Sequence, residues 1–392
     1  MLFPTPTSRS QHPGPGGDDG RLKAPVAEGD PPLTAGEPPG LVPGGPGDKG
    51  GLGAAKPGPG SEVRHRLYAK IRGMAQAGRK LELVEKALAR LSPLESACAL
   101  CPRDCRVDRT KSAEGVCRTG HLASVSHALL HFGEEPVISG TSGSGTIFFT
   151  GCNLKCLFCQ NYQLSWLLEG EPVSDEELAG LMLGLQAKGA HNINFVSPTH
   201  VVLPILRALR IALSEGLAIP LVWNSNGYDG LDVIRALEGI VDIYLPDLKY
   251  HSPSVSKKYS AAGDYFASAS EALREMSIQQ PVLDLGPGGT ARRGLVIRHL
   301  ILPGSVEDTL VILKWVRENL SPFIGLSLMS QYHPCFRAPD EIQRGVSVEE
   351  CRRAADEALA LGFDHLFLQP EPFRPDEHLV PDFRKEKPFR WK

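Results

Sequence analysis

The chain has 392 residues, of which 42% are hydrophobic, so it can bury the core of one large domain or two medium ones. Its formal net charge of −3 gives no general attraction to nucleic acid or to anionic lipid, and we expect neither as a partner. No apolar run is long enough to span a membrane, and the first residues carry neither a secretory signal nor a mitochondrial address, which favours a cytoplasmic location.

The N-terminal part of the chain has two sections of different composition. Residues 1–60 are rich in Pro and Gly and poor in aliphatic side chains, so we expect a disordered tail that cannot offset its ordering entropy by burial. Residues 61–145 are predicted to be a helical and cysteine-rich extension, with a helix over 62–91 and a connector of short strands and turns over 121–145. At the other end, 371–392 is predicted to be a C-terminal tail.

From residue 146 to 370, short apolar runs alternate with amphipathic patterns. This alternation predicts an α/β domain with a parallel sheet covered by helices on both faces. A doubly wound sheet and a full or partial (β/α) barrel both fit the pattern, although no Gly-x-Gly-x-x-Gly opens a helix after the first strand. The predicted strands are Thr146–Thr150, Ile193–Ser197, Pro220–Asn224, Val241–Leu245, Leu295–Leu302, Gly325–Met329 and His365–Leu368. The predicted helices cover 174–189, 201–215, 230–238, 264–277, 306–320 and 347–361, the last with the capping signature Ser347-Val-Glu-Glu350.

The nine cysteines are clustered along the sequence. Four lie between Cys98 and Cys117 and three between Cys152 and Cys159, whereas Cys335 and Cys351 stand alone and carry no prediction. An odd number of cysteines in a long chain without a secretory signal argues against a disulfide framework. Tight groups of thiols in a reducing compartment indicate metal sites instead.

The second group has the spacing Cys152-x3-Cys156-x2-Cys159 and directly follows the first predicted strand of the α/β domain. Sites in barrels and open α/β sheets are built at this end of the strands. Three thiolates this close in sequence can hold three irons of one iron–sulfur cluster and leave the fourth iron open. A structural zinc needs a fourth ligand, and the next histidine is His191. The spacing therefore leaves two interpretations, a zinc site with a distant fourth ligand or a cluster with an open coordination position.

The cysteine motif, with Phe158 just before its last cysteine, resembles the signature of the radical S-adenosylmethionine (SAM) superfamily, and the likeness extends over about 146–370. Within that superfamily the chain is similar to the branch related to pyruvate formate-lyase-activating enzyme. The segments that carry this second likeness are Thr150-Gly-Cys-Asn-Leu-Lys-Cys-Leu-Phe-Cys-Gln-Asn161, Val196-Ser-Pro-Thr-His200, Asn224-Ser-Asn-Gly-Tyr228, Asp242-Ile-Tyr-Leu-Pro-Asp-Leu-Lys249 and Ile297-Arg-His-Leu-Ile-Leu-Pro-Gly304.

The resemblance implies a partial (β/α)6 barrel, a [4Fe–4S] cluster on Cys152, Cys156 and Cys159, and SAM as the second cofactor. It also implies an oxidoreductase that takes an electron from an external donor and cleaves SAM to methionine and a 5′-deoxyadenosyl radical. A glycyl-radical enzyme is the expected protein partner on which this radical acts. The alternatives are a radical enzyme that modifies a small molecule or another macromolecule, and a metal-binding interaction protein without catalytic activity.

Phe158 of the cysteine motif and polar residues at the predicted strand ends are the candidates for binding SAM. Where the family usually has a Gly-Gly-Glu segment, this chain has Ser197-Pro-Thr-His200, so Ser197 and Thr199 replace the carboxylate as oxygen donors, or Thr199 caps the following helix. Asn224 ends the third predicted strand, either as a ligand-binding group or as part of a turn. Asp247 and Lys249 alternate along the next segment and face the same way, which suits ribose hydroxyls and a carboxylate as well as a rim salt bridge.

Two further sets of residues have less defined roles. Arg298 and His299 are neighbours in one strand, so only one can point inward, and the resemblance implies that His299 reaches the ribose. Late in the chain, Gln331, His333 and Gln369 follow predicted strands and could line a substrate channel.

The first cysteine group has the spacing Cys98-x2-Cys101-x3-Cys105-x11-Cys117. Four thiols can close a metal site, which suits a structural zinc or an auxiliary iron–sulfur cluster. The segment resembles the N-terminal cysteine-rich portion of relatives in the same subfamily. The alternative is four reduced cysteines without a metal.

Overall fold

The structure is a computed structural model that describes residues 77–369 and 380–389. The predicted tail over 1–60 and the first half of the predicted helix over 62–91 lie outside the described residues. Residues 77–91 are helical and are followed by the short 3-10 helix η1 (Ser92–Leu94). Lys80 in this helix forms a largely buried ion pair with Asp242, which ties the cysteine-rich extension to the α/β domain.

The centre of the fold is a sheet whose strands follow the order β10-β9-β8-β6-β5-β4-β2-β1-β3, with β7 paired to β8. Strands β2, β4, β5, β6, β8, β9 and β10 are parallel to one another. All seven predicted strands are therefore confirmed, although β6 is shorter and β8 begins earlier than the apolar runs indicate. The bounds are β1 Ala123–His131, β2 Ser144–Phe149, β3 Glu171–Val173, β4 Ile193–Val196, β5 Leu221–Asn224, β6 Ile243–Tyr244, β7 Asp284–Leu285, β8 Ala291–Leu300, β9 Gly325–Met329 and β10 His365–Leu368.

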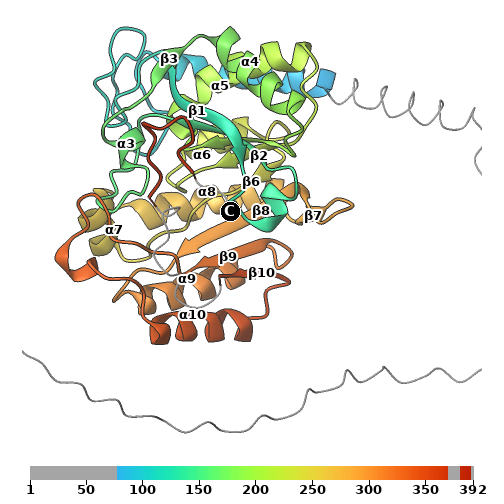
Figure 1. Cartoon of the computed structure of the whole chain (residues 1–392). Coiled ribbons are helices and arrows are strands. Elements are labelled where there is room, and N and C mark those ends of the chain that lie inside the picture. Colours follow the sequence, from blue (N-terminus) through green and yellow to red (C-terminus); the bar gives the residue numbers. More distant parts are fainter. Residues whose placement is uncertain (1–76, 370–379, 390–392) are drawn as a thin grey trace, which may run out of the picture. The chain divides into compact units, whose positions relative to one another are not determined.

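Helices cross over between the parallel strands, and in Figure 1 the pairs α4–α5 and α9–α10 lie against the two ends of the strand series. Capping boxes begin two of them: Ser347 with Glu350, as predicted, and Ser174 with Glu177. Helix α7 was not predicted, because it is short and polar. The bounds are α2 Pro136–Ser139, α3 Tyr162–Ser165, α4 Asp175–Ala187, η2 Thr199–Val201, α5 Val202–Ser214, α6 Leu231–Ala236, α7 Pro253–Ser260, α8 Tyr265–Gln279, α9 Val306–Asn319, η3 Asp340–Ile342 and α10 Val348–Ala360. No helix of the part of the chain that the structure describes is long and apolar enough to cross a membrane.

This architecture is the predicted α/β class with a parallel sheet and crossover helices, and it matches a partial TIM-like barrel. The strand interiors are apolar and buried on both faces, as in β5, where every residue is buried. The antiparallel strand β1 extends the sheet beyond β2, and the connector predicted over 121–145 supplies it.

The C-terminal residues that the structure describes pack against the α/β domain, although 371–392 was predicted to be a tail. The ring of Phe383 lies 5.2 Å from that of Phe148 on β2, and Gln163 Nε2 donates a hydrogen bond to Asp382 at 3.0 Å. Residues 380–389 therefore belong with the domain, because aromatic side chains from the segment cover an apolar face of β2.

Candidate active site

A cavity of about 480 Å³ opens at the carboxyl ends of the parallel strands. Its volume lies within the range of small-molecule sites. Its lining includes all three thiols of the Cys152–Cys159 segment, which we call the three-cysteine loop, together with polar side chains at the carboxyl ends of β4, β5, β6 and β8. The sheet topology thus brings the candidate residues of several strand ends to one space, as expected for a barrel-type site.

Each sulfur of the three-cysteine loop accepts a hydrogen bond from a neighbouring polar group. Burial raises the pKa of the Cys152 thiol, and it raises the pKa of the Cys159 thiol to about 12. Free thiols at these positions therefore keep their protons near neutral pH, and metal binding would have to release them. The donors are Asn226 Nδ2 to Cys152 Sγ at 3.3 Å, Ser260 Oγ to Cys156 Sγ at 3.0 Å, and Ser165 Oγ to Cys159 Sγ at 3.2 Å.

Backbone contacts hold the three-cysteine loop in place. The Leu157 N–H donates to the Tyr259 carbonyl at 2.8 Å, and the Leu157 carbonyl accepts from the Arg337 N–H at 2.9 Å. The ring of Phe158 packs edge-on against that of Tyr332, with centroids 5.5 Å apart. Gly151, just before the loop, has a φ of +79°, which favours glycine over residues with a side chain.

A group of buried charged side chains lines part of the cavity. Arg298 Nε donates to Asp247 Oδ1 at 2.9 Å, and Arg298 Nη1 lies 3.2 Å from Glu134 Oε2. Lys249 Nζ donates to the other oxygen of Asp247 at 2.5 Å. Asn224 joins the group, since it accepts from Arg298 Nη2 and donates to Glu134. Two cations and two carboxylates thus share one hydrogen-bonded network.

The pKa values of the two carboxylates in this network are shifted in opposite directions. Burial disfavours the charged form of Asp247, but the neighbouring Arg298 and Lys249 outweigh that effect and lower its pKa. Burial raises the pKa of Glu134, and the attraction of Arg298 reduces this shift without reversing it. The difference follows from the number of close cations, because Asp247 bonds to two and Glu134 to one.

Five of the seven predicted SAM-binding residues line the cavity, and two do not. Thr199 is buried elsewhere, where its hydroxyl donates to Asp229 at 2.6 Å, and no side-chain hydrogen bond caps η2. Ser197 does line the cavity and has a φ of +56°, an uncommon conformation for a residue with a side chain. The residues that line it are Phe158, Ser197, Asn224, Asp247 and Lys249.

The structure resolves the choice between Arg298 and His299 in favour of arginine. Arg298 points into the cavity, whereas the His299 ring contacts the Leu248 carbonyl at 2.6 Å and the Thr309 hydroxyl at 2.9 Å. Thr309 belongs to α9, so His299 lies between the sheet and a helix, where burial lowers its pKa. The structure therefore places Arg298 at the cavity and His299 away from it, where the ring lies beyond the expected ribose position, since neighbouring residues of a strand face opposite sides.

Sequence reasoning missed Glu134, which reaches the cavity from the connector between β1 and α2. Its charge and its place in an acidic pair are visible in the sequence, but its partners Asn194, Asn224 and Arg298 lie far along the chain. Gln331, His333 and Gln369 line the same cavity, as expected of channel residues.

The thiols of the first cysteine group, Cys98, Cys101, Cys105 and Cys117, line a separate small pocket, which we call the four-cysteine pocket. Within residues 77–369 and 380–389, no three His, Cys, Asp or Glu side chains are arranged to hold one single metal ion. This holds for both cysteine groups.

A comparison with protein families assigns the domain that contains the three-cysteine loop. Residues 146–291 match the family model described as the radical SAM superfamily. The chain contains a radical SAM domain. The matched residues begin in β2, include the three-cysteine loop and end in β8, so they contain most of the strand ends that line the cavity.

Proteins similar to this chain were found among curated sequences and solved structures. The uncharacterised protein MJ0674 of Methanocaldococcus jannaschii is 29% identical over 282 residues, which are 69% of this chain and 76% of that protein. SuiB of Streptococcus suis has 14% identity and a TM-score of 0.40 over 58% of this chain, which spans about half of SuiB, 47%. Methylornithine synthase (PylB) has 16% identity and a TM-score of 0.34, over 56% of this chain and 69% of that enzyme.

The radical SAM domain matched over 146–291 implies a [4Fe–4S] cluster and SAM as cofactors, with oxidoreductase-type chemistry. The donor set in this chain fits such a group. Three sulfurs border one cavity, each already accepts a hydrogen bond as a thiolate ligand would, and polar side chains line the same space.

Proposed function

We propose that Cys152, Cys156 and Cys159 bind three irons of a [4Fe–4S] cluster, and that the adjoining cavity binds SAM for reductive cleavage. The observation that carries the proposal is the convergence of three hydrogen-bonded sulfurs on a cavity of about 480 Å³ within the radical SAM domain. When bound, such a cluster would supply the one electron that reductive cleavage of the sulfonium requires, which breaks one C–S bond of SAM to give methionine and a 5′-deoxyadenosyl radical.

The residues of this chain would bind and orient SAM. Lys249 offers ammonium hydrogens to the methionine carboxylate, while Asp247 accepts hydrogen bonds from ribose hydroxyls or from the methionine ammonium. Glu134 supplies a carboxylate to a cavity whose Ser197–His200 segment lacks the usual one. Arg298 fixes both acids, since it bonds to each of them. The protein's part in the chemistry is this positioning, together with the exclusion of side reactions.

We further propose that the radical acts on a glycine of a partner enzyme, with an external electron donor as the second partner. The support is the likeness of the strand-end motifs to the pyruvate formate-lyase-activating branch. A small molecule or another macromolecule is the alternative target. Incubation with a candidate glycyl-radical enzyme separates the two, because activation gives a carbon-centred electron paramagnetic resonance (EPR) doublet on that partner, and its absence with active protein contradicts the glycyl target.

The cleavage itself is tested with protein reconstituted anaerobically with iron and sulfide. With a reductant and SAM, the protein is expected to release 5′-deoxyadenosine, and Cys156→Ala is expected to abolish that release. Cys351→Ala is the matched control, because it removes a buried thiol of α10 that belongs to neither cysteine group. Release that persists in Cys156→Ala at the control level would contradict the assignment of the loop.

A further inference from the structure

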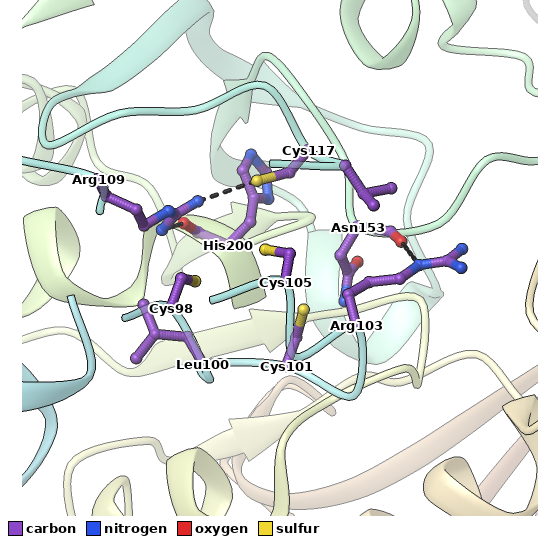
Figure 2. A pocket seen from close by; sticks show the side chains of 10 residues that line it. Cys98, Leu100, Cys101, Arg103, Cys105, Arg109, Cys117, Asn153 and His200 are labelled. Carbon is purple, nitrogen blue, oxygen red and sulfur yellow. Dashed lines mark hydrogen bonds between the residues drawn. The ribbon is translucent and has the colours of Figure 1, made fainter. Parts of the chain in front are cut away.

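The four-cysteine pocket is built by a tightly wound segment of the N-terminal extension. Figure 2 shows its four sulfurs turned toward one shared space. Asp104 and Arg106 on either side of Cys105 have φ values of +40° and +55°, which residues with side chains seldom adopt. Such strained backbone persists where the surroundings enforce it and gathers at ligand sites. The backbone conformation of this segment therefore directs its thiols toward one space.

Arg109 places a buried positive charge against this pocket. Its side chain is only 3% exposed, and Nη2 donates to Cys117 Sγ at 2.9 Å, as the dashed line in Figure 2 marks. Nη1 donates to the His200 carbonyl at 2.5 Å, and buried Nε has no hydrogen-bond partner. Among the described residues no carboxylate forms an ion pair with Arg109. A buried guanidinium needs a compensating negative charge, and thiolates around a metal centre supply one.

The arrangement of the four thiols favours a cluster over a single zinc ion. Tetrahedral zinc requires all its sulfurs about 2.3 Å from one point. The four thiols line one pocket, but within the described part of the chain no three such ligands are arranged around one ion. The three-cysteine loop, whose family binds a [4Fe–4S] cluster, likewise has no three described ligands arranged around one ion. A cluster distributes its ligands over several irons and so accommodates both groups.

The pocket lies directly against the three-cysteine loop. The side chain of Asn153 lines the pocket, and its Oδ1 accepts from Asn226 Nδ2 at 2.8 Å, the same amide that donates to Cys152 Sγ. A Cβ on Gly151 would lie 2.6 Å from the Cys117 carbonyl, so the two segments are in close contact. The Asn153 backbone carbonyl also accepts from Arg103 Nε at 2.7 Å.

We propose that the four-cysteine pocket binds a second [4Fe–4S] cluster, packed against the loop that carries the first. Four thiols lose their protons on binding, and every iron then has a protein ligand, so this cluster has no open position for SAM. The proposal goes beyond the cleavage activity and does not depend on it.

The test counts metals in the full chain after anaerobic reconstitution, by elemental analysis for iron, zinc and sulfide, with EPR of the reduced samples. The wild type is expected to hold about eight irons per chain and no stoichiometric zinc, as two cubane clusters require. The triple variant Cys152→Ala, Cys156→Ala, Cys159→Ala is expected to retain about four irons and a reduced-cluster EPR signal. The double variant Cys98→Ala, Cys105→Ala is expected to retain about four, and Cys351→Ala about eight.

The iron content of the triple variant is the decisive measurement. This variant keeps all four cysteines of the four-cysteine pocket, so it remains informative even if the double variant does not fold. Loss of all iron from the triple variant would overturn the second cluster, and so would one zinc per chain in its place. A wild type with about four irons that the triple variant fully retains would instead contradict the first site and support the second. The two failures are thus distinguishable.

Discussion

Glu134 and Arg298 are 164 positions apart in the sequence and form a buried ion pair of 3.2 Å inside the cavity. Both lie outside the matched radical SAM residues 146–291, Glu134 in the connector before them and Arg298 near the end of β8 after them. The site is therefore completed by two segments that the family match does not include.

Glu134→Gln is expected to weaken SAM binding and to destabilise the protein by about 2–4 kcal/mol, because it leaves Arg298 with one carboxylate in place of two. Anaerobic calorimetry with SAM and urea unfolding measure the two effects. Glu169→Gln is the control, since it breaks the exposed pair with Arg384 and is expected to cost less than about 1 kcal/mol. Equal effects of the two substitutions would show that the buried pair has no special role.

Arg298→Lys and His299→Gln are expected to act on different properties. A lysine cannot reproduce the forked contacts to Asp247 and Asn224, so we expect at least a tenfold loss of 5′-deoxyadenosine release. His299→Gln is expected to lower stability by about 1–3 kcal/mol, because it disturbs two buried hydrogen bonds, with little change in SAM affinity. Nucleoside release and urea unfolding are measured on both variants. If His299→Gln lost nucleoside release and Arg298→Lys did not, His299 and not Arg298 would belong to the site.

Gly151→Ala is expected to destabilise the protein more than Gly189→Ala. Both glycines have positive φ, at +79° and +84°, so both substitutions incur the left-handed cost of about 1–2 kcal/mol. Only Gly151 would bring its new Cβ against the Cys117 carbonyl, whereas Gly189 has open space. Unfolding of the two variants isolates the contact between the three-cysteine loop and the four-cysteine pocket. A difference near zero would mean that the two segments separate at no cost.

Glu350 gives a prediction of pH dependence at the start of α10. Hydrogen bonds from Arg344 lower its pKa, and bonds from the Ser347 and Gly304 N–H groups act in the same direction. Because the folded pKa lies below the unfolded value of about 4.3, its stabilising effect is complete above that pH and is lost as the pH falls further. Glu350→Gln is expected to lose about 1 kcal/mol at pH 7 and less at pH 3. Urea unfolding at both pH values checks this, and a constant difference would contradict it.

The strands were predictable because an apolar run of five residues is a local signal, and so was the capping box of Ser347 and Glu350. Helix α7 was not predicted, because its buried residues are Ser256, Tyr259 and Ser260, which do not form a periodic pattern of apolar side chains. Side-chain direction was harder. Alternation states that Arg298 and His299 face opposite ways, but only the packing of α9 determines which side is inward.

Residues that depend on distant partners could not be found from the sequence. Glu134 becomes a cavity residue only through Asn194, Asn224 and Arg298, and no local pattern links them. In the same way, the convergence of the four N-terminal thiols was predicted from their spacing, but their position against Asn153 was not.

The hydrogen bond between Arg109 and the His200 carbonyl has a consequence for biosynthesis. The two residues are 91 positions apart, and His200 follows β4, the second parallel strand. During translation the thiols of the extension leave the ribosome well before the wall that encloses them has been made. The pocket is complete only after β4 has paired with β2. A metal centre enclosed by the complete pocket is therefore acquired after the barrel has begun to assemble.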